Sequence, residues 1–268
     1  MQRYFIQSEQ FRDQTIVLDG EEAHHLIRVM RARPGDRIIV SDGERREALA
    51  ELTRIDRDAA EASVVEWLAM DREPAVKVTV AQSLPKGDKL ELVIQKGTEL
   101  GASRFIPFIS ERTVVQYDER KEAKRLERWR KIAKEAAEQA HRSRVPSVEA
   151  PASWKQLLQM SGQYDLALFC YEQAGGSAGL RPLLMKLREE WSTRHDAAEG
   201  IAAPAAQGPS VLLIIGPEGG FSEREAEQAA QAGMHPVGLG KRILRTETAG
   251  LVGLACIMYE FNEMGGTR

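Results

Sequence analysis

Two glycine-rich segments near the end of the chain have the residue types and spacing that a ligand pocket needs. The first glycine segment, IGPEGGFS (215–222), follows an apolar run and precedes a predicted helix. The second glycine segment, GLGKRILRTETAG (238–250), repeats this order with a basic turn before its helix. Glycine permits positive φ and close approach of a ligand to the backbone, and amides at a helix N-terminus are free to bind one. We expect the two segments to form one pocket, although each is also compatible with an ordinary tight turn.

The residues in these segments narrow the kind of ligand. Neither segment matches GxGxxG or GxxxxGK[ST], the two glycine motifs that bind nucleotide phosphates. Glu218 in the first segment would repel a phosphate, so a neutral or cationic ligand fits better. Arg242 and Arg245 are predicted to lie beside Glu247 at the pocket edge, where the charges could act on a substrate. Alternatively, Thr246 caps the following helix and Glu247 interacts with the helix dipole.

An α/β domain is predicted to position both segments. Apolar runs at 166–172 and 211–216 have the composition of strands buried on both faces. Strands and helices alternate from residue 75 onward, which is typical of a largely parallel sheet. Ligands of such sheets bind at the carboxyl ends of the strands. The remaining predicted strands are 76–82, 104–110 and 236–240. The predicted helices are 90–101, 122–141, 222–233 and 248–261, and Ser222 and Glu225 are predicted to form a capping box at the start of the third.

The first part of the chain follows a different pattern. Short alternating stretches separated by turn residues predict a small β-rich barrel, with one helix at 21–31. A change of pattern at Arg72–Glu73–Pro74 divides the chain into domains at 1–72 and 73–268.

Composition excludes several classes of protein. The chain has 268 residues, of which 43% are hydrophobic and 29% charged, and this composition is globular. No apolar run approaches the roughly 20 residues that a membrane span needs. The opening residues do not resemble a secretory leader, so we expect a cytoplasmic protein with no membrane partner. Cys170 and Cys256 are predicted to be reduced core residues. The five histidines have no metal-ligand spacing, so no metal is expected.

The charge is unevenly distributed. Residues 73–146 carry 16 basic and 11 acidic side chains, whereas the rest of the chain is acidic. The densest part, residues 120–144, has 10 basic and 4 acidic side chains. Such a stretch is either an electrostatic footprint for a polyanion or a solvated helix face, and charge alone does not separate the two.

Three motifs in the C-terminal half, LALFCYE (166–172), IGPEGGFS and LGKRILRTETA (239–249), together resemble the SPOUT class of S-adenosylmethionine-dependent RNA methyltransferases. The similarity is greatest to the bacterial family that methylates N3 of a uridine in small-subunit ribosomal RNA. The resemblance extends over the whole chain through further motifs, namely HHLIRVMR (24–31), GDRIIVSDG (35–43), PKGDKLELVIQKGTELG (85–101), SERTVV (110–115) and EAAEQAHRSRVP (135–146).

This resemblance implies a fold and a cofactor. The implied fold is an α/β trefoil-knot methyltransferase domain preceded by a PUA-like RNA-binding barrel, assembled as a homodimer with the pocket close to the subunit interface. The implied cofactor is S-adenosylmethionine, bound among three loops. The residues expected to bind it are Leu168, Tyr171, Glu172, Ile215, Gly216, Pro217, Glu218, Gly219, Gly220, Leu239, Gly240, Ile243, Leu244 and Thr246.

The chemistry of the implied reaction suggests two catalytic residues. Uridine N3–H must lose its proton for methyl transfer, so the enzyme needs a base or a donor that stabilises the charge spread over O2 and O4. Arg245 is the candidate for charge stabilisation, and Glu247 for base or cofactor contact. The target base must be unpaired or splayed out of its stack. The residues expected to contact the ribosomal RNA or the small subunit are Arg28, Arg31, Lys86, Arg112 and Arg142.

Two alternative functions explain the sequence less well. A non-catalytic RNA-binding factor for ribosome assembly could keep the fold, but it would not need a cofactor pocket. A dinucleotide oxidoreductase would need the GxGxxG motif and an acidic ribose-binding residue, and the sequence has neither.

Overall fold

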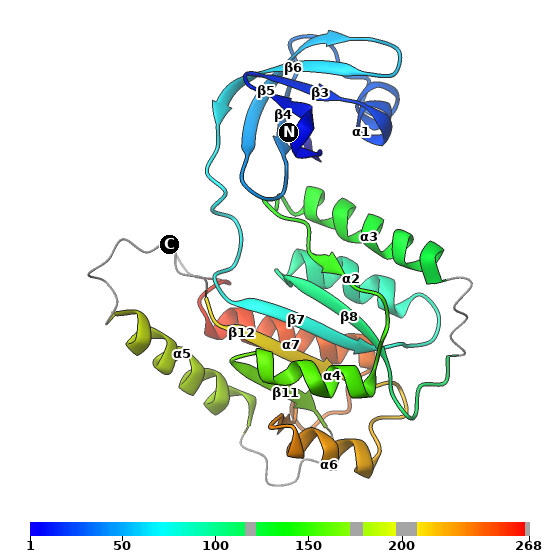
Figure 1. Ribbon diagram of the computed structural model, residues 1–268, viewed down its shortest axis with the longest axis vertical. Coiled ribbons are helices and arrows are strands. Elements are labelled where there is room, and N and C mark those ends of the chain that lie inside the picture. The colour runs from blue at the N-terminus through cyan, green and yellow to red at the C-terminus, as the bar shows by residue number, and fades with distance from the viewer. Residues whose placement is uncertain (116–121, 172–178, 197–207, 266–268) are drawn as a thin grey trace. The chain divides into compact units, whose positions relative to one another are not determined.

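The computed structural model describes residues 1–115, 122–171, 179–196 and 208–265 of the chain (Figure 1). It contains two compact units. The N-terminal unit comprises Met1–Glu73 and Lys134–Val145, and the C-terminal unit comprises Pro74–Ala133 and Pro146–Arg268.

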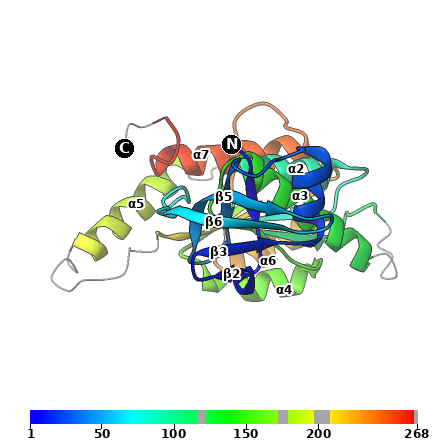
Figure 2. The same cartoon turned by 90° about the horizontal axis from the view of Figure 1, so that it is seen from above.

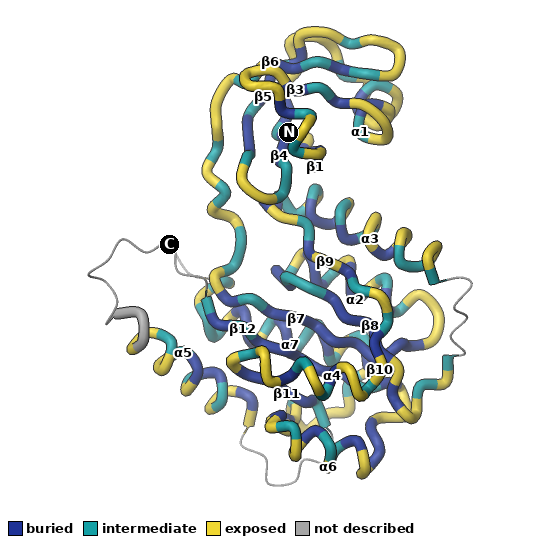
Figure 3. Tube along the Cα trace, viewed as in Figure 1, coloured by how far each residue is buried: buried dark blue, intermediate teal, exposed yellow. Residues whose placement is uncertain are grey.

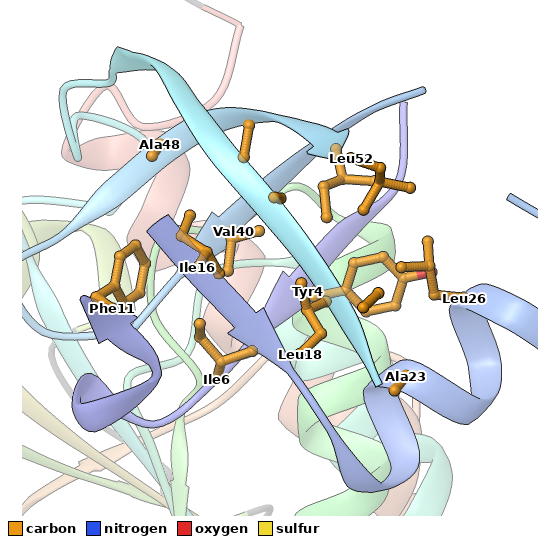
Figure 4. Close-up of a cluster of buried hydrophobic side chains, with 14 residues drawn as sticks. Tyr4, Ile6, Phe11, Ile16, Leu18, Ala23, Leu26, Val40, Ala48 and Leu52 are labelled. Carbon is orange, nitrogen blue, oxygen red and sulfur yellow. The ribbon is translucent and has the colours of Figure 1, made fainter. Parts of the chain in front are cut away.

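The N-terminal unit is built on a curled six-stranded sheet. Its strands, in the spatial order β1-β4-β5-β6-β3-β2, are β1 (Arg3–Phe5), β4 (Arg37–Ser41), β5 (Glu47–Ile55), β6 (Ala60–Trp67), β3 (Thr15–Leu18) and β2 (Phe11–Arg12). The first pair is parallel and the others are antiparallel. The concave face surrounds one apolar core that includes Ile16, Leu18, Val40 and Leu52 (Figure 4). The predicted β-rich N-terminal unit is therefore present, with β1 and β2 at the two edges of its sheet.

The predicted helix at 21–31 is present in an altered form. After one turn of α-helix, α1 (Gly20–His24), the chain widens into a π-helix, η2 (His25–Val29). The backbone N–H of Met30 donates to the carbonyl of His25 at 3.0 Å. Arg31 then takes the left-handed conformation, with φ of 53°. The turn exposes the side chains of Arg28, Val29, Met30 and Arg31.

The segment Lys134–Val145 belongs to the N-terminal unit, although the sequence placed it in the second domain. Hydrogen bonds explain this. Arg3 forms a buried ion pair with Glu47 and also donates to the carbonyl of Arg142 at 3.0 Å. Glu73 accepts hydrogen bonds from the Arg142 side chain and from the amides of Ser143 and Arg144. The polar groups of the turn at residues 142–144 are thus paired with Arg3 and Glu73 of the N-terminal unit. Contacts between such distant residues leave no periodic pattern in the sequence.

The C-terminal unit contains the predicted parallel sheet. Six of its seven strands lie in the order β10-β8-β7-β12-β11-β13, and β9 pairs with β8. Every paired strand in it is parallel to its neighbour. The strands are β7 (Lys77–Ser83), β8 (Arg104–Ile109), β9 (Ser147–Val148), β10 (Ala152–Ser153), β11 (Leu166–Cys170), β12 (Ser210–Ile215) and β13 (His235–Val237). The central strands are buried, as Figure 3 shows, which agrees with their continuous apolar sequences.

Helices cover both faces of this sheet (Figure 2). On one face, Gly97 of α2 and Gly253 of α7 allow close packing, because a Cβ there would lie 2.7 Å from Phe105 and 3.0 Å from Leu213. On the other face lie α4 and α6, over a cluster that includes Phe108. The helices are α2 (Lys89–Glu99), α3 (Glu122–Gln139), α4 (Trp154–Met160), α5 (Leu180–Asp196), α6 (Glu223–Gln231) and α7 (Thr246–Glu260). Short 3-10 turns, η1 (Ser8–Gln10) and η4 (Ser161–Gln163), complete the described elements.

The two cysteines differ from each other. Both are free, as expected. Cys170 ends β11, and burial raises the pKa of its thiol to about 12. Cys256 is exposed on α7, so the prediction that it is a core residue is wrong. Its side chain lies on the face of the helix turned away from Leu254 and Ile257, which are buried.

Candidate active site

A cavity of about 590 Å³ lies in the C-terminal unit, at the carboxyl ends of three adjacent strands. β11 is the middle strand, paired with β12 on one side and β13 on the other. The chain that leaves each strand contributes to the wall, so both glycine segments and Tyr171 meet there. This is where an open parallel sheet offers free backbone groups to a ligand. The predicted single pocket is therefore present.

The first glycine segment turns sharply at the cavity. The amide of Gly220 donates to the carbonyl of Pro217 at 2.9 Å, and Gly220 has a φ of 65°. A Cβ at Gly220 would meet no atom of the described chain within 4 Å, whereas one at Gly216 would lie 2.8 Å from the Phe221 ring. The predicted capping box follows, because the Ser222 hydroxyl accepts from the Glu225 amide and the Glu225 carboxylate accepts from the Ser222 amide. A helix start thus fixes the end of the segment.

The second glycine segment is joined to the first by Thr246. Thr246 is the first residue of α7, and its hydroxyl donates to the carbonyl of Gly216 at 2.6 Å. The same hydroxyl accepts from Nε2 of Gln82 at 2.7 Å. Arg245 is the N-cap residue, and its side chain makes no capping hydrogen bond. Thr246 therefore joins the two segments rather than capping the helix.

Lys89 bridges two carboxylates beside the cavity. Its Nζ lies 2.9 Å from Oε1 of Glu218 and 3.5 Å from Oε2 of Glu247. The Lys86 amide also donates to Glu218, at 3.1 Å. Burial alone would raise the pKa of Glu218, but the hydrogen bonds from Lys89 and Lys86 outweigh it and lower that pKa. The hydrogen bond with Glu218 raises the pKa of Lys89. The negative charge expected on the first segment is therefore real but partly neutralised.

Two arginines of the second segment are available for a substrate. Arg242 and Arg245 line the cavity and are exposed. Neither arginine side chain makes a hydrogen bond or an ion pair with the described part of the chain. Arg112, by contrast, donates from Nη1 to the carbonyl of Gly219 at 3.1 Å. The guanidinium donors of Arg242 and Arg245 are therefore available to a substrate in the cavity.

Most of the residues expected to bind a cofactor line this cavity. Those that do are Tyr171, Ile215, Gly216, Pro217, Glu218, Gly219, Gly220, Leu239, Gly240, Ile243, Leu244 and Thr246. Leu168 does not, because it is fully buried within β11. Glu172 lies outside the described residues. Of the two candidate catalytic residues, Arg245 lines the cavity, whereas Glu247 lies behind the wall against Lys89.

The sequence reasoning missed several lining residues. They are Lys89, Cys170, Phe221, Val237, Gly238 and Ala249, and Arg112 was expected at the RNA instead. Most lie next to predicted positions in the chain, so their sequence neighbours could have indicated them. Lys89 is different, because it comes from α2, more than a hundred residues earlier in the chain. Only tertiary structure brings it to Glu218.

The five residues expected to contact RNA fall into different environments. Arg28 and Arg31 are exposed on the N-terminal unit, and Lys86 is exposed on the C-terminal unit. Arg112 is held at the cavity by Gly219. Arg142 is only 5% exposed and its guanidinium is paired with Glu73, so few of its donors are open to RNA. The basic stretch in which it lies gave no sign that this one arginine is buried.

The described residues contain neither a metal site nor a membrane-spanning helix. No group of three histidine, cysteine or carboxylate side chains is arranged to hold a metal ion within that part of the chain. None of the helices described is both long and apolar enough to cross a bilayer.

Comparison with known proteins gives both units a family. A family model described as an RNA methyltransferase domain matches residues 72–258, and one described as an RNA methyltransferase PUA domain matches residues 18–65. Ribosomal RNA small subunit methyltransferase E of Bacillus subtilis is 42% identical over the full length of both chains. The protein of that name in Synechocystis is 35% identical, over 95% of this chain and 76% of its own.

A solved structure shows the same arrangement of elements. The crystal structure of a ribosomal RNA small subunit methyltransferase E from Neisseria gonorrhoeae, bound to S-adenosyl methionine, superposes with a TM-score of 0.77. The two chains are 32% identical, and the match covers 97% of each. With the glycine segments meeting at one cavity and both family models matched, the chain belongs to the RNA methyltransferase family that includes ribosomal RNA small subunit methyltransferase E.

Proposed function

We propose that the protein transfers a methyl group from S-adenosylmethionine to N3 of a uridine in small-subunit (16S) ribosomal RNA. The observation that carries this proposal is the cavity at the ends of β12, β11 and β13, where both glycine segments meet beside Arg245, whose side chain has no partner among the described residues. The names of the relatives support ribosomal RNA of the small subunit as the substrate. The Neisseria structure supports the cofactor.

The residues of the cavity fit S-adenosylmethionine. Gly220 and Gly240 have positive φ, and a Cβ on either would meet no atom of the described residues within 4 Å. This is the cradle that a ligand packed against backbone needs. The cofactor carries a sulfonium and no phosphate, which agrees with the absence of a phosphate-binding motif and with Glu218 in the wall. The backbone of the two segments would hold it, and it supplies a methyl group activated on a positively charged sulfur.

Arg245 has the position and the chemistry to act on the uridine. Loss of the N3 proton leaves negative charge on O2 and O4, and a planar guanidinium can donate to such oxygens in two directions. Arg245 is exposed at the cavity and keeps its donors free of the described residues. The Glu247 carboxylate lies against Lys89, so its role as base is the weaker of the two assignments. Holding N3 in line with the transferred methyl is the remaining contribution of the site.

RNA binding is proposed for the exposed basic residues of both units. Arg28 and Arg31 flank the exposed apolar pair Val29 and Met30 on the N-terminal unit. Arginine suits bidentate phosphate contacts, and apolar side chains can pack on an unstacked base. Because base edges in a stacked helix are inaccessible, the target uridine must be splayed out for transfer.

Two further features of the proposal concern the chain fold and the assembly. We propose that the methyltransferase domain contains the trefoil knot of SPOUT proteins, in which the chain around the cavity is threaded.

We also propose that the protein is a homodimer. The outward face of α7 supports this, since Tyr259 is 70% exposed and the neighbouring Cys256 is exposed as well.

The decisive experiment maps modified uridines. Ribosomal RNA from cells with and without the gene would be compared by mass spectrometry, and unmodified small subunits would be incubated with the purified protein and S-adenosylmethionine. We expect one N3-methyluridine to be absent without the gene and restored in vitro. A protein that binds the small subunit and leaves its uridines unmodified would instead be a ribosome-assembly factor.

A further inference from the structure

One buried polar side chain outside the cavity wall contacts the junction of the two glycine segments. Gln82 is the penultimate residue of β7 and is 1% exposed. Its Nε2 donates to Oγ1 of Thr246 at 2.7 Å and to the carbonyl of Ser83 at 3.3 Å. Thr246 in turn donates to the carbonyl of Gly216. Three segments that are distant in sequence are thus joined by one chain of hydrogen bonds.

The direction of these hydrogen bonds is fixed by chemistry. A threonine hydroxyl has one hydrogen, and the carbonyl of Gly216 can only accept. Oγ1 of Thr246 must therefore accept from Gln82, which requires the amide nitrogen, rather than the amide oxygen, to face Thr246. A side chain without a donor at this point would leave the hydroxyl of Thr246 with its acceptor side empty.

Packing does not by itself explain a glutamine at this position. Its Oε1 is buried and has no hydrogen-bond partner among the described residues. The helix α7 lies directly on it, since a Cβ at Gly250 would be 3.2 Å from that oxygen. A buried acceptor without a partner is costly, and an apolar side chain of similar size would avoid the cost. The donor contact to Thr246 is what an apolar side chain would lack.

We propose that Gln82 is a positioning residue for the cofactor site. By holding Thr246, and through it the carbonyl of Gly216, Gln82 sets the separation between the two glycine segments before a ligand enters. It touches neither cofactor nor substrate. This inference rests on the proposed function, because it assumes that S-adenosylmethionine binds between these segments.

Two substitutions separate the donor from the packing. Gln82→Met keeps the size and removes the donor, so we expect S-adenosylmethionine to bind up to about tenfold more weakly at every pH, which is the upper end for one hydrogen bond. Gln82→Glu retains a donor only while its carboxyl is protonated. Burial raises the pKa of such a carboxyl, so we expect affinity close to that of the parent at pH 5.5 and weaker binding at pH 8.5.

The measurement is calorimetric titration of the whole protein with S-adenosylmethionine and with its demethylated product, from pH 5.5 to 8.5. The charged groups around this junction are Lys89 on α2, Glu218 on the first glycine segment, and Arg245 and Glu247 at the start of α7. All four are present in the parent protein, whose own pH profile therefore corrects for them. Single-turnover methylation by each Gln82 variant is then measured at saturating cofactor. This tests whether the rate of methyl transfer equals that of the parent once the weaker binding of cofactor is overcome.

A matched control lies in the same strand. Thr79 is buried in β7 and accepts a hydrogen bond from the Tyr164 hydroxyl at 3.2 Å, away from the glycine segments. Thr79→Val should lower thermal stability and leave cofactor affinity unchanged. In a Thr246→Val background, Gln82→Met should add little further loss, since the contact is already absent.

Several outcomes would overturn the inference. Unchanged affinity in a folded Gln82→Met variant would show that the contact does not position the site. Weaker binding by Gln82→Glu with the same pH profile as the parent would show that the donor is not responsible. If Gln82→Met fails to fold, Gln82→Glu compared with itself across pH still tests the donor. A parent protein that does not bind S-adenosylmethionine would contradict the proposed function itself, which is a distinguishable result.

Discussion

At the scale of single residues, the start of α7 separates two side chains that are close in sequence. Arg245 precedes the helix and faces the cavity, whereas Glu247 lies in its first turn and contacts Lys89. The order RTET alone gives both residues an equal claim to the chemistry. Their different surroundings favour Arg245.

Arg245→Lys tests this assignment. We expect the rate of methyl transfer to fall on the order of a hundredfold, which is typical when one donor to a developing anion is lost, while cofactor affinity stays nearly unchanged. Lysine keeps the charge but lacks the planar fork. Single-turnover kinetics with saturating RNA measures the effect. Lys241→Ala, an exposed neighbour outside the cavity wall, is the control for general loss of positive charge.

Glu247→Gln tests the competing assignment. If Glu247 were the base, this variant would lose a similar factor in rate and recover part of it at alkaline pH, where uridine N3 ionises unaided. A pH–rate profile of the variant decides between the two. Alkaline recovery together with a nearly normal rate for Arg245→Lys would reverse our assignment.

At the scale of elements, a turn in the N-terminal unit depends on one ionised carboxylate. Oδ1 of Asp42 accepts from the amides of Glu44, Arg45 and Arg46, and Oδ2 accepts from the Arg46 guanidinium at 3.1 Å. Burial alone would raise the pKa of Asp42, but these four donors outweigh it and hold the pKa well below its usual range. The turn between β4 and β5 is therefore stabilised by charge.

Asp42→Asn should lower the free energy of unfolding at pH 7 by about 1–3 kcal/mol, the usual cost of losing hydrogen bonds to a charged group. Because the pKa of Asp42 is lower in the folded state, its contribution is fully present above the unfolded value of about 3.9 and is lost as the pH falls toward the folded value. The difference between variant and parent should therefore shrink below about pH 4. Urea unfolding at pH 7 and pH 3 measures it. An equal difference at both pH values would mean that shape rather than charge is responsible.

The basic helix α3 illustrates the limit of reading charge along a sequence. Arg128 donates to Glu91 at 2.7 Å, Arg130 donates to the carbonyl of Val148, and Lys134 pairs with Glu22. Part of the positive charge is thus neutralised within each unit. These pairs favour a solvated helix face, and they direct attention to Arg28 and Arg31 as RNA contacts.

At the scale of the whole molecule, RNA binding should depend on salt and on the N-terminal unit. Reversing Arg28 and Arg31 to glutamate should weaken binding to small-subunit RNA and reduce the salt slope by about 0.7 for each lost phosphate contact on single strands. Titrations at several salt concentrations measure this slope. The control is Arg57→Glu, because Arg57 is an exposed arginine of the same unit that is not among the proposed RNA contacts. Equal slopes in both variants would place the RNA elsewhere.

The proposed homodimer gives a second prediction at this scale. Tyr259 is 70% exposed on the outward face of α7, and an aromatic side chain of this kind is typical of an interface. We expect a dimer at micromolar concentration in sedimentation experiments, and Tyr259→Asp should shift it toward monomer with little change in thermal unfolding of the chain. A monomeric parent protein at these concentrations would contradict the homodimer.

The sequence by itself was sufficient for features that depend on neighbours along the chain. The parallel sheet followed from continuous apolar runs such as 211–216, and the start of α6 followed from the Ser222 and Glu225 pair. Both are local, because strand burial shows in composition and a capping box closes within four residues. The glycine segments indicated the cavity because their glycines, too, are close neighbours along the chain.

Only the tertiary structure decided which distant groups meet. Gln82 reaches Thr246 across 164 positions of the chain, and Lys89 reaches Glu218 across 129. Arg142 shares a basic stretch with exposed arginines, yet it is buried and forms an ion pair with Glu73. Periodicity and propensity describe the environment a residue makes with its near neighbours, whereas a hydrogen bond between remote elements depends on the register of the sheet that brings them together. The candidate pocket was therefore predictable from local sequence, but the contacts that hold it in shape were not.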